Sequence, residues 1–191
     1  MKHYIIYVPG LGDDYDDARR LALKGWRIWG VKTELVPMCW YDGKPYDEKQ
    51  RRVIESVKRA QNKGYAVSLI GESAGGSLAI NVAAQVSMLH RLITIGGVNN
   101  PAIQVSPHTL QKAPAFDESI RRLVDSLPKI ATSRTHVVRA LYDPIVHAKY
   151  TYISGAHNHR IYSIGHLTTI VLCLSIFSSY IVSLIKRTPN V

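Results

Sequence analysis

Residues 68–77 read S-L-I-G-E-S-A-G-G-S, and this segment restricts the fold more than any other part of the chain. Two apolar residues, Leu69 and Ile70, are followed closely by three glycines, Gly71, Gly75 and Gly76. A glycine inside a helix costs about 1 kcal/mol relative to alanine, and an ordinary surface turn needs fewer small residues. The segment therefore indicates a backbone shape that larger side chains would block.

The rest of the chain alternates between apolar runs and segments with helical spacing. Strands are expected at 2–8, 31–37, 65–70, 91–95, 135–141 and 160–164. Helices are expected at 13–24, 46–62, 77–89 and 116–126, with a last one beginning near His166 and a loop at 99–115. Strands that alternate with helices are joined by right-handed crossovers and lie parallel. We therefore expect one α/β domain over residues 1–191, a three-layer sandwich of about six mainly parallel strands with helices on both faces.

Chain length and cysteine content bound the class of protein. The chain has 191 residues, which suits one domain with a sizeable core. Its two cysteines are too few for a disulfide framework, so a reducing, cytoplasmic location is expected. The apolar run at 4–8 ends at Pro9-Gly10 and is too short for a signal peptide. No residue pattern requires a cofactor or a metal, and we expect neither.

The net charge is +10, and basic residues gather at 19–27 and 49–63. Such a balance fits nucleic acid, anionic lipid, an acidic substrate or simply solvated helix faces. Solvated helix faces are favoured, because no aromatic residues alternate with the charges as a stacking platform for bases requires. Nucleic acid is therefore not expected as a partner, and the sequence sets no oligomeric state.

Residues that directly follow the strands matter most, because ligands of parallel sheets bind beyond the carboxyl ends of the strands. After the third strand, Gly71 to Gly75 match G-x-S-x-G, a sharp strand-to-helix turn that strains Ser73 and projects its hydroxyl. Gly71 and Gly75 leave room for neighbouring backbones, and Gly76 lets the helix pack on the sheet. The alternative is a glycine-rich turn with an incidental serine. The position between a buried strand and a helix favours the first interpretation.

Two further side chains with suitable chemistry follow later strands. Asp143 comes after the fifth strand, where a helix N-cap is the alternative role. His166 is the one histidine of eight placed directly after a predicted strand, 160–164. Ser73, Asp143 and His166 therefore meet at one sheet edge, in the chain order typical of one class of catalytic triad. The backbone N–H groups of Ala74 and Leu11 are the expected oxyanion donors.

These residues resemble the α/β-hydrolase superfamily, and G-E-S-A-G-G is similar to the elbow of carboxylesterases and lipases. The resemblance covers nearly the whole chain and is to small serine hydrolases that lack a large cap domain. It implies cleavage of a small-molecule carboxylic ester through an acyl-enzyme. A thioesterase, an amidase and a non-catalytic binding protein on the same scaffold are the alternatives. The chain departs from many relatives in carrying Pro9-Gly10 where they carry His-Gly.

Four residues are candidates for a substrate pocket: Trp40, Tyr41, Asn99 and Asn100. Loop capping by the asparagines and surface positions for the aromatics are equally consistent with the sequence. The segment 98–115 is a candidate small lid, since it is too short for a folded cap domain.

The segment 167–185 carries no charged residue and approaches the length of a membrane span. Six Ser or Thr residues fall on one half of a helical wheel, and apolar residues lie opposite. We therefore expect a C-terminal helix over 166–185 that packs on the sheet. Leu172 and Ile176 interrupt the polar half, so a dimer contact or a membrane-surface contact is the less favoured alternative.

Overall fold

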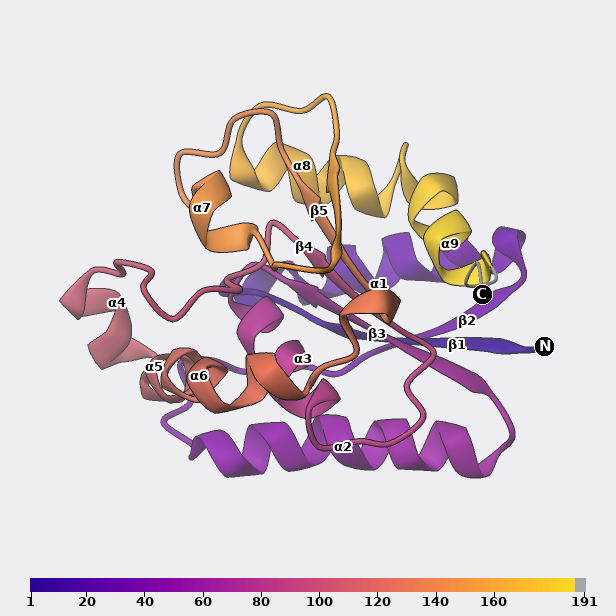
Figure 1. The fold of residues 1–191 in the computed structure, drawn as a ribbon, viewed down its shortest axis with the longest axis horizontal. Coiled ribbons are helices and arrows are strands. Elements are labelled where there is room, and N and C mark those ends of the chain that lie inside the picture. The colour runs from indigo at the N-terminus through magenta and orange to yellow at the C-terminus, as the bar shows by residue number, and fades with distance from the viewer. Residues whose placement is uncertain (188–191) are drawn as a thin grey trace.

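The computed structural model describes residues 1–187, and its centre is one six-stranded sheet (Figure 1). The strands are β1 (His3–Val8), β2 (Val31–Leu35), β3 (Ala66–Glu72), β4 (Arg91–Ile95), β5 (Thr135–Arg139) and β6 (His157–Arg160). Their order is β2-β1-β3-β4-β5-β6, and every neighbouring pair is parallel. The predicted α/β class with six parallel strands is confirmed. The order reverses between β1 and β3, which is where sheets of this type bind ligands.

Helices cover both faces of the sheet (Figure 1). One face carries α2 (Tyr46–Asn62), α3 (Ala74–Ala83), α5 (Pro114–Arg121) and α6 (Leu123–Ser126). The other carries α1 (Asp16–Gly25), α8 (His166–Leu174) and α9 (Ser178–Lys186). Alternate residues of the inner strands supply the two cores: in β1, Ile6 and Val8 lie in the core with α2 and α3, and Ile5 and Tyr7 lie in the core with α1 and α8. The predicted three layers are therefore present.

The expected loop at 99–115 contains a short helix, α4 (Pro107–Lys112), and α5 begins at Pro114 rather than at residue 116. Ser106 caps α4, because its hydroxyl accepts a hydrogen bond of 3.2 Å from the Thr109 N–H. Pro107 and Pro114 stand in the first turns of the two helices, where proline is tolerated. Prolines that suggested a loop thus mark helix starts. The remaining short elements are α7 (Ala148–Thr151) and the 3₁₀ turns η1 (Asp13–Tyr15), η2 (Trp26–Trp29), η3 (Leu127–Lys129) and η4 (Thr132–Arg134).

The last strand lies earlier than predicted. It is β6, His157–Arg160, and the expected strand 160–164 contributes only an isolated bridge between Ile164 and Tyr142. Strand β6 is at the edge of the sheet and half exposed, so its residues H-N-H-R are polar and give no apolar signal. Strand β5 likewise ends at Arg139, not at residue 141, and α3 occupies 74–83, not 77–89.

The C-terminal segment forms two helices instead of the predicted single helix over 166–185. Helices α8 and α9 meet at a bend of 68°. The backbone leaves helical values at Ser175 (φ −113°, ψ −91°), and both the Ser175 N–H (3.0 Å) and its hydroxyl (2.6 Å) donate to the Val171 carbonyl at the end of α8. Both helices still pack on the sheet through residues such as Cys173, Ile181 and Ile185. Within residues 1–187 no single helix is long and apolar enough to cross a membrane; α8 and α9 pass that test only as a bent pair, by length and composition.

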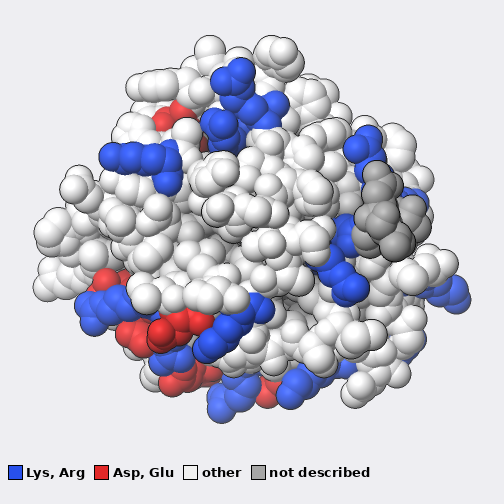
Figure 2. All heavy atoms as spheres, viewed as in Figure 1, with Lys and Arg blue, Asp and Glu red and all other residues white. Residues whose placement is uncertain are grey.

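The basic residues of α2 differ in their exposure to solvent. Figure 2 shows blue and red side chains alternating along the lower rim of the molecule, over α2. Arg51 and Lys58 are exposed, as the sequence predicted, and Arg51 lies 3.9 Å from the exposed Glu55. Lys49 is different: it is fully buried, and its Nζ donates to the carbonyls of Met38 (2.9 Å) and Cys39 (2.8 Å). The prediction of a solvated side chain is wrong at this position.

Strands β5 and β6 bring three histidines together. His136 stacks on both His157 and His159, and its Nδ1 lies 2.9 Å from the Nε2 of His159. The His159 Nδ1 is 3.0 Å from the Tyr180 hydroxyl. Burial, together with the charges that His159 and His157 would carry, lowers the pKa of His136 to about 4.

This histidine group is expected to make the fold acid-sensitive. Between pH 6.5 and 4 the unfolded chain protonates residue 136 while the folded protein does not, so the unfolding free energy falls as pH falls. A lowered pKa of about 4 corresponds to a loss of about 3 kcal/mol. Urea unfolding at pH 7, 5.5 and 4.5 should show this slope, and His136→Phe should flatten it. The exposed His108→Phe is the control; an unchanged slope in His136→Phe would contradict the assignment.

Candidate active site

Ser73 occupies the sharp turn between β3 and α3. Its backbone has φ 49° and ψ −122°, one of three positive φ values among the non-glycine residues in 1–187. Such a conformation costs about 1–3 kcal/mol and persists only when its surroundings hold it. Two hydrogen bonds do so here: the Ser73 N–H donates to Ile95 O (3.0 Å), and the Val98 N–H donates to Ser73 O (2.9 Å). The end of β4 therefore holds the strained serine in place.

The three glycines beside Ser73 are needed for close backbone approach. A Cβ on Gly71 would lie 2.5 Å from the Gly75 carbonyl oxygen, and one on Gly75 would lie 2.7 Å from that of Pro9. A Cβ on Gly76 would lie 2.8 Å from the Gly97 Cα. These contacts explain why the sequence places glycines directly after an apolar strand, as predicted.

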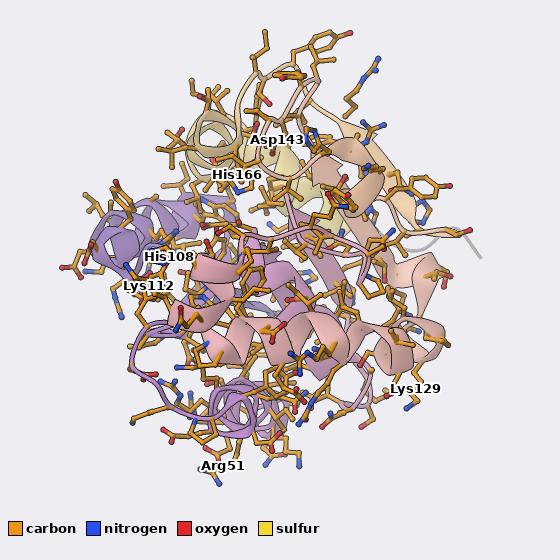
Figure 3. All side chains as sticks on the ribbon, turned by 90° about the vertical axis from the view of Figure 1, so that its left-hand side faces the viewer. Arg51, His108, Lys112, Lys129, Asp143 and His166 are labelled. Carbon is orange, nitrogen blue, oxygen red and sulfur yellow. The ribbon has the colours of Figure 1, made fainter. Side chains whose placement is uncertain are left out.

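The structure brings Ser73, His166 and Asp143 together at the carboxyl ends of the strands. The His166 Nε2 lies 2.8 Å from the Ser73 Oγ, and its Nδ1 lies 2.7 Å from the Asp143 Oδ2. Figure 3 shows His166 and Asp143 next to each other on one side of the molecule. His166 and Asp143 are buried, while Ser73 is partly accessible. A serine hydroxyl reachable from solvent is thus hydrogen-bonded to a histidine that a carboxylate orients.

Asp143 contacts His166 and also holds its own turn, but it is not the helix N-cap considered as the alternative, because the next helix, α7, begins at Ala148 after His147. Its Oδ2 contacts His166, while its Oδ1 accepts hydrogen bonds from the N–H groups of Ile145 (2.9 Å) and Val146 (3.0 Å). Burial by itself raises the pKa of Asp143, but the hydrogen bonds from His166, Val146 and Ile145 outweigh it and hold the pKa below its ordinary value. The carboxylate is therefore charged at neutral pH.

Two loops position Asp143 and His166, since neither residue directly follows a strand. Leu141 donates to Ser163 O (3.0 Å) and Gly165 donates to Tyr142 O (2.9 Å), so the two loops pair beyond β5 and β6. Gly96, with φ +52°, makes space for the imidazole: a Cβ there would lie 3.2 Å from the His166 Cε1. Sequence reasoning missed this role, although the Gly96-Gly97 pair after a buried strand was its signal.

The loop after β1 lies against Ser73. A Cβ on Gly10 would be 2.7 Å from the Ser73 Cβ, so this loop reaches the nucleophile position. Within residues 1–187, the Leu11 N–H donates in none of the loop and turn hydrogen bonds, and Ala74 is the first residue of α3, where an N–H has no partner inside its own helix. They are therefore free to bind an oxygen that develops negative charge beside Ser73.

The four candidate pocket residues are placed differently from one another. Trp40 is fully buried, and its Nε1 donates to the Pro9 carbonyl (3.1 Å). Asn99 is buried and donates to Thr94 Oγ1 (2.8 Å) and Thr151 O (2.6 Å). The structure thus places Trp40 and Asn99 as supports of the loops around the site.

The other two candidate pocket residues, Asn100 and Tyr41, are less buried. The Asn100 Oδ1 accepts a 2.9 Å hydrogen bond from the Ala102 N–H, which fits loop capping. Tyr41 is exposed and lines a hollow of about 560 Å³ with His108, Thr109 and Lys112. In Figure 3, His108 and Lys112 of α4 lie on the same side of the molecule as His166. Tyr41 is therefore the candidate that faces a hollow.

A buried ionic network supports the site from behind, and sequence reasoning missed it. Glu72, the residue before Ser73, is 1% exposed, and its Oε1 accepts from Arg19 Nη2 (2.6 Å). Its Oε2 accepts from Arg19 Nε (3.0 Å) and from the Tyr7 hydroxyl (2.5 Å). Arg19 also donates to the Gly12 carbonyl (2.8 Å) of the loop after β1. Arg19 was predicted on a solvated face, and that prediction is wrong because α1 turns it inward.

The signal for this network was a carboxylate at the end of an apolar strand. A charged group buried at that position needs a charged or hydrogen-bonding partner. The sequence does not show which of the many basic residues supplies it. No group of three or more His, Cys, Asp or Glu side chains suited to a metal ion occurs in the part of the chain that the structure describes.

Comparison with known proteins identifies chains with a similar fold. No protein-family model matches the chain, and no curated protein does. Solved structures do. One is from the metagenome-derived lipolytic enzymes LipS and LipT, with a TM-score of 0.70 and 11% identity over 97% of this chain and 94% of that one. Another is the ydeN gene product from B. subtilis, with a TM-score of 0.65 and 14% identity over 98% and 100%.

Carboxyl esterase 2 from Tuber melanosporum is also similar, with a TM-score of 0.69 and 15% identity over 98% of this chain and 79% of that chain. Identities this low establish the fold alone. The chain has the α/β-hydrolase fold, in agreement with the resemblance that its sequence motifs suggest.

Proposed function

We propose that the protein is a serine hydrolase that cleaves carboxylic esters of small molecules through an acyl-enzyme. The observation that supports this most is the hydrogen-bonded series from the strained Ser73 through His166 to Asp143. If these three residues only capped a helix or filled the core, their side chains would not need to form this series of hydrogen bonds. The similar structures named as lipolytic enzymes and a carboxyl esterase agree with this choice of reaction.

In the proposed mechanism, His166 Nε2 accepts the Ser73 proton as Oγ attacks the ester carbonyl carbon. The carbonyl oxygen becomes an oxyanion, and the N–H groups of Leu11 and Ala74 bind it. When this intermediate collapses, the bond to the alkoxy oxygen breaks and His166 returns the proton to the leaving alcohol. A water molecule then repeats the sequence on the acyl-enzyme and releases the carboxylic acid and free Ser73. Asp143 orients the imidazole and stabilises its positive charge.

Labelling with a fluorophosphonate tests this proposal. Such probes react quickly at neutral pH with a serine that has a general base and an oxyanion site, so Ser73 should be the labelled residue. Mass spectrometry of the digested adduct locates the label. Labelling should disappear in Ser73→Ala and fall strongly in His166→Ala. Ester hydrolysis by Ser73→Ala should be at most about 10³-fold faster than the uncatalysed reaction in water.

Ser77→Ala is the matched control, because Ser77 lies one turn further along α3 and its hydroxyl is hydrogen-bonded to Ala74 O (2.9 Å). It should keep the label. A panel of ester, thioester and amide substrates then defines the bond that is cleaved. A folded wild-type protein that takes up no probe and hydrolyses nothing in the panel would contradict the proposal in favour of a binding protein.

A further inference from the structure

A second hollow lies at the edge of the sheet opposite Ser73. It has a volume of about 690 Å³ and is formed where β1, β2 and β3 begin. Its lining includes Lys2, Tyr4, Arg27, Lys32, Lys63 and Tyr65. A neighbouring hollow of about 260 Å³ shares Tyr4 and Arg27 with it and adds Arg20 and Lys24. We call the two together the basic groove.

The basic groove is separate from the candidate active site. Tyr65 precedes the first residue of β3, whereas Ser73 follows its last residue, and the strand between them has seven residues. At about 3.3 Å per residue, the eight steps from Tyr65 to Ser73 place the two sites about 25 Å apart. The volume of the larger hollow is within the usual range of about 300–1,000 Å³ for small-molecule sites.

Most basic side chains of the groove have no carboxylate partner; among the ion pairs of residues 1–187, Arg20 is the exception, 3.9 Å from the exposed Asp17. Among the residues that the structure describes, none that lines the larger hollow is acidic. Glu34 lines the smaller one, but it already accepts from Arg59 (2.6 Å) and from the Tyr4 hydroxyl (2.9 Å). Among the ion pairs of residues 1–187, none includes Lys2, Lys32 or Lys63.

Several basic residues elsewhere in residues 1–187 do have a carboxylate partner. On α2 and the loop before it, Lys44, Lys49, Arg51 and Arg59 each have a carboxylate partner. On the face shown in Figure 2, the right-hand side, where the strands begin, carries blue side chains without red ones among them. Like charges held together without a counter-charge repel one another, so an anionic ligand would be stabilised in the groove.

Tyr65 marks the point where these charges converge. The Lys32 Nζ donates a 2.6 Å hydrogen bond to the Tyr65 hydroxyl and lies 5.1 Å from the ring centroid. This hydrogen bond, outweighing burial, lowers the pKa of Tyr65, and the charges of Lys32, Lys2 and Lys63 lower it further. Lys2, Lys32 and Lys63 thus line the same hollow as Tyr65.

We propose that the basic groove binds a small anionic ligand that carries two or more phosphate groups. Lysine ammonium and arginine guanidinium groups are the usual hydrogen-bond donors to bound phosphate. The forked guanidinium of arginine can bind two phosphate oxygens at once. Several such groups spaced around one hollow match several linked phosphates better than a single carboxylate. Tyr4 and Tyr65 pack on each other with centroids 5.3 Å apart, so they do not present the open row of ring faces that single-stranded nucleic acid requires.

Calorimetric titration of the full chain with inorganic triphosphate tests this proposal. Triphosphate should bind to the wild-type protein, with an affinity that decreases as salt is added. Lys32→Ala/Lys63→Ala should weaken binding at least 10-fold. Lys58→Ala/Lys129→Ala is the charge-matched control, since both lysines are exposed and line neither part of the groove, and it should bind within 2-fold of wild type. Circular dichroism checks that both variants are folded.

Two results would overturn the proposal. One is no heat of binding with 1 mM triphosphate at low salt; the other is an equal loss of binding in the two double variants, which would assign the effect to net charge. Binding of a ten-residue oligothymidylate without binding of triphosphate would assign the groove to nucleic acid instead. Ser73→Ala should bind triphosphate normally, so this result is independent of the proposed hydrolase activity.

Discussion

Replacement of Asp143 by asparagine is expected to lower kcat for ester hydrolysis about 10⁴-fold without unfolding the protein. The asparagine oxygen can still accept from the N–H groups of Ile145 and Val146, so the turn is retained. Its amide nitrogen would then face the His166 Nδ1, where the carboxylate now lies at 2.7 Å. A donor at that position favours the tautomer with the proton on Nε2, and this tautomer cannot accept the Ser73 proton.

Steady-state kinetics on a chromogenic short-chain ester measure this effect, with circular dichroism to check the fold. His166→Ala should remove most turnover as well, because Ser73 then has no base. The control is Asp125→Asn, an exposed carboxylate on α6, which should keep wild-type kcat. If Asp143→Asn kept full activity while His166→Ala lost it, Asp143 would be only the anchor of its turn and another acid would orient the imidazole.

Much of the fold was predictable because the central strands are buried on both faces. β1, β3 and β4 give continuous apolar runs, and the residues that follow them in a parallel sheet must collect at one edge. The order of apolar runs along the chain is therefore enough to predict that Ser73 and the Gly10–Leu11 loop lie near each other. The same reasoning predicts Asp143 and His166, although short paired loops separate both of them from their strands.

The errors have a common physical origin in features that sequence periodicity does not register. The edge strand β6 is polar because one side of it faces solvent, so its pattern differs from that of the central strands. The break near Ser175 is a change of backbone conformation at one residue (φ −113°, ψ −91°), inside a segment whose apolar residues continue on both sides of it. The Arg19–Glu72 pair joins residues 53 positions apart, and nothing local distinguishes Arg19 from its exposed neighbour Arg20.

The buried ion pair between Arg19 and Glu72 is expected to contribute strongly to the free energy of unfolding. In Arg19→Ala, the Glu72 carboxylate would stay buried with the Tyr7 hydroxyl and a long 3.4 Å contact to the Gly10 N–H. Removal of one partner of a buried ion pair typically costs about 3–5 kcal/mol, because the other charge is left without compensation. Urea unfolding should show this loss in Arg19→Ala. Arg20→Ala, whose nearest carboxylate is 3.9 Å away and exposed, should change the unfolding free energy by less than about 1 kcal/mol.

The same substitution should also slow the chemistry in the molecules that remain folded. Arg19 is hydrogen-bonded to the Gly12 carbonyl, and its loss frees the loop that carries the Leu11 N–H. Loss of one oxyanion donor costs about 10²–10³-fold in kcat, so Arg19→Ala should lose kcat with little change in KM, and fluorophosphonate labelling should slow in parallel. The double variant Arg19→Met/Glu72→Gln removes both charges and should recover most of the stability, since it leaves no charge of the pair buried. If it also recovered full kcat, the network would be only structural; recovery of stability without kcat would show that Arg19 positions the loop for catalysis.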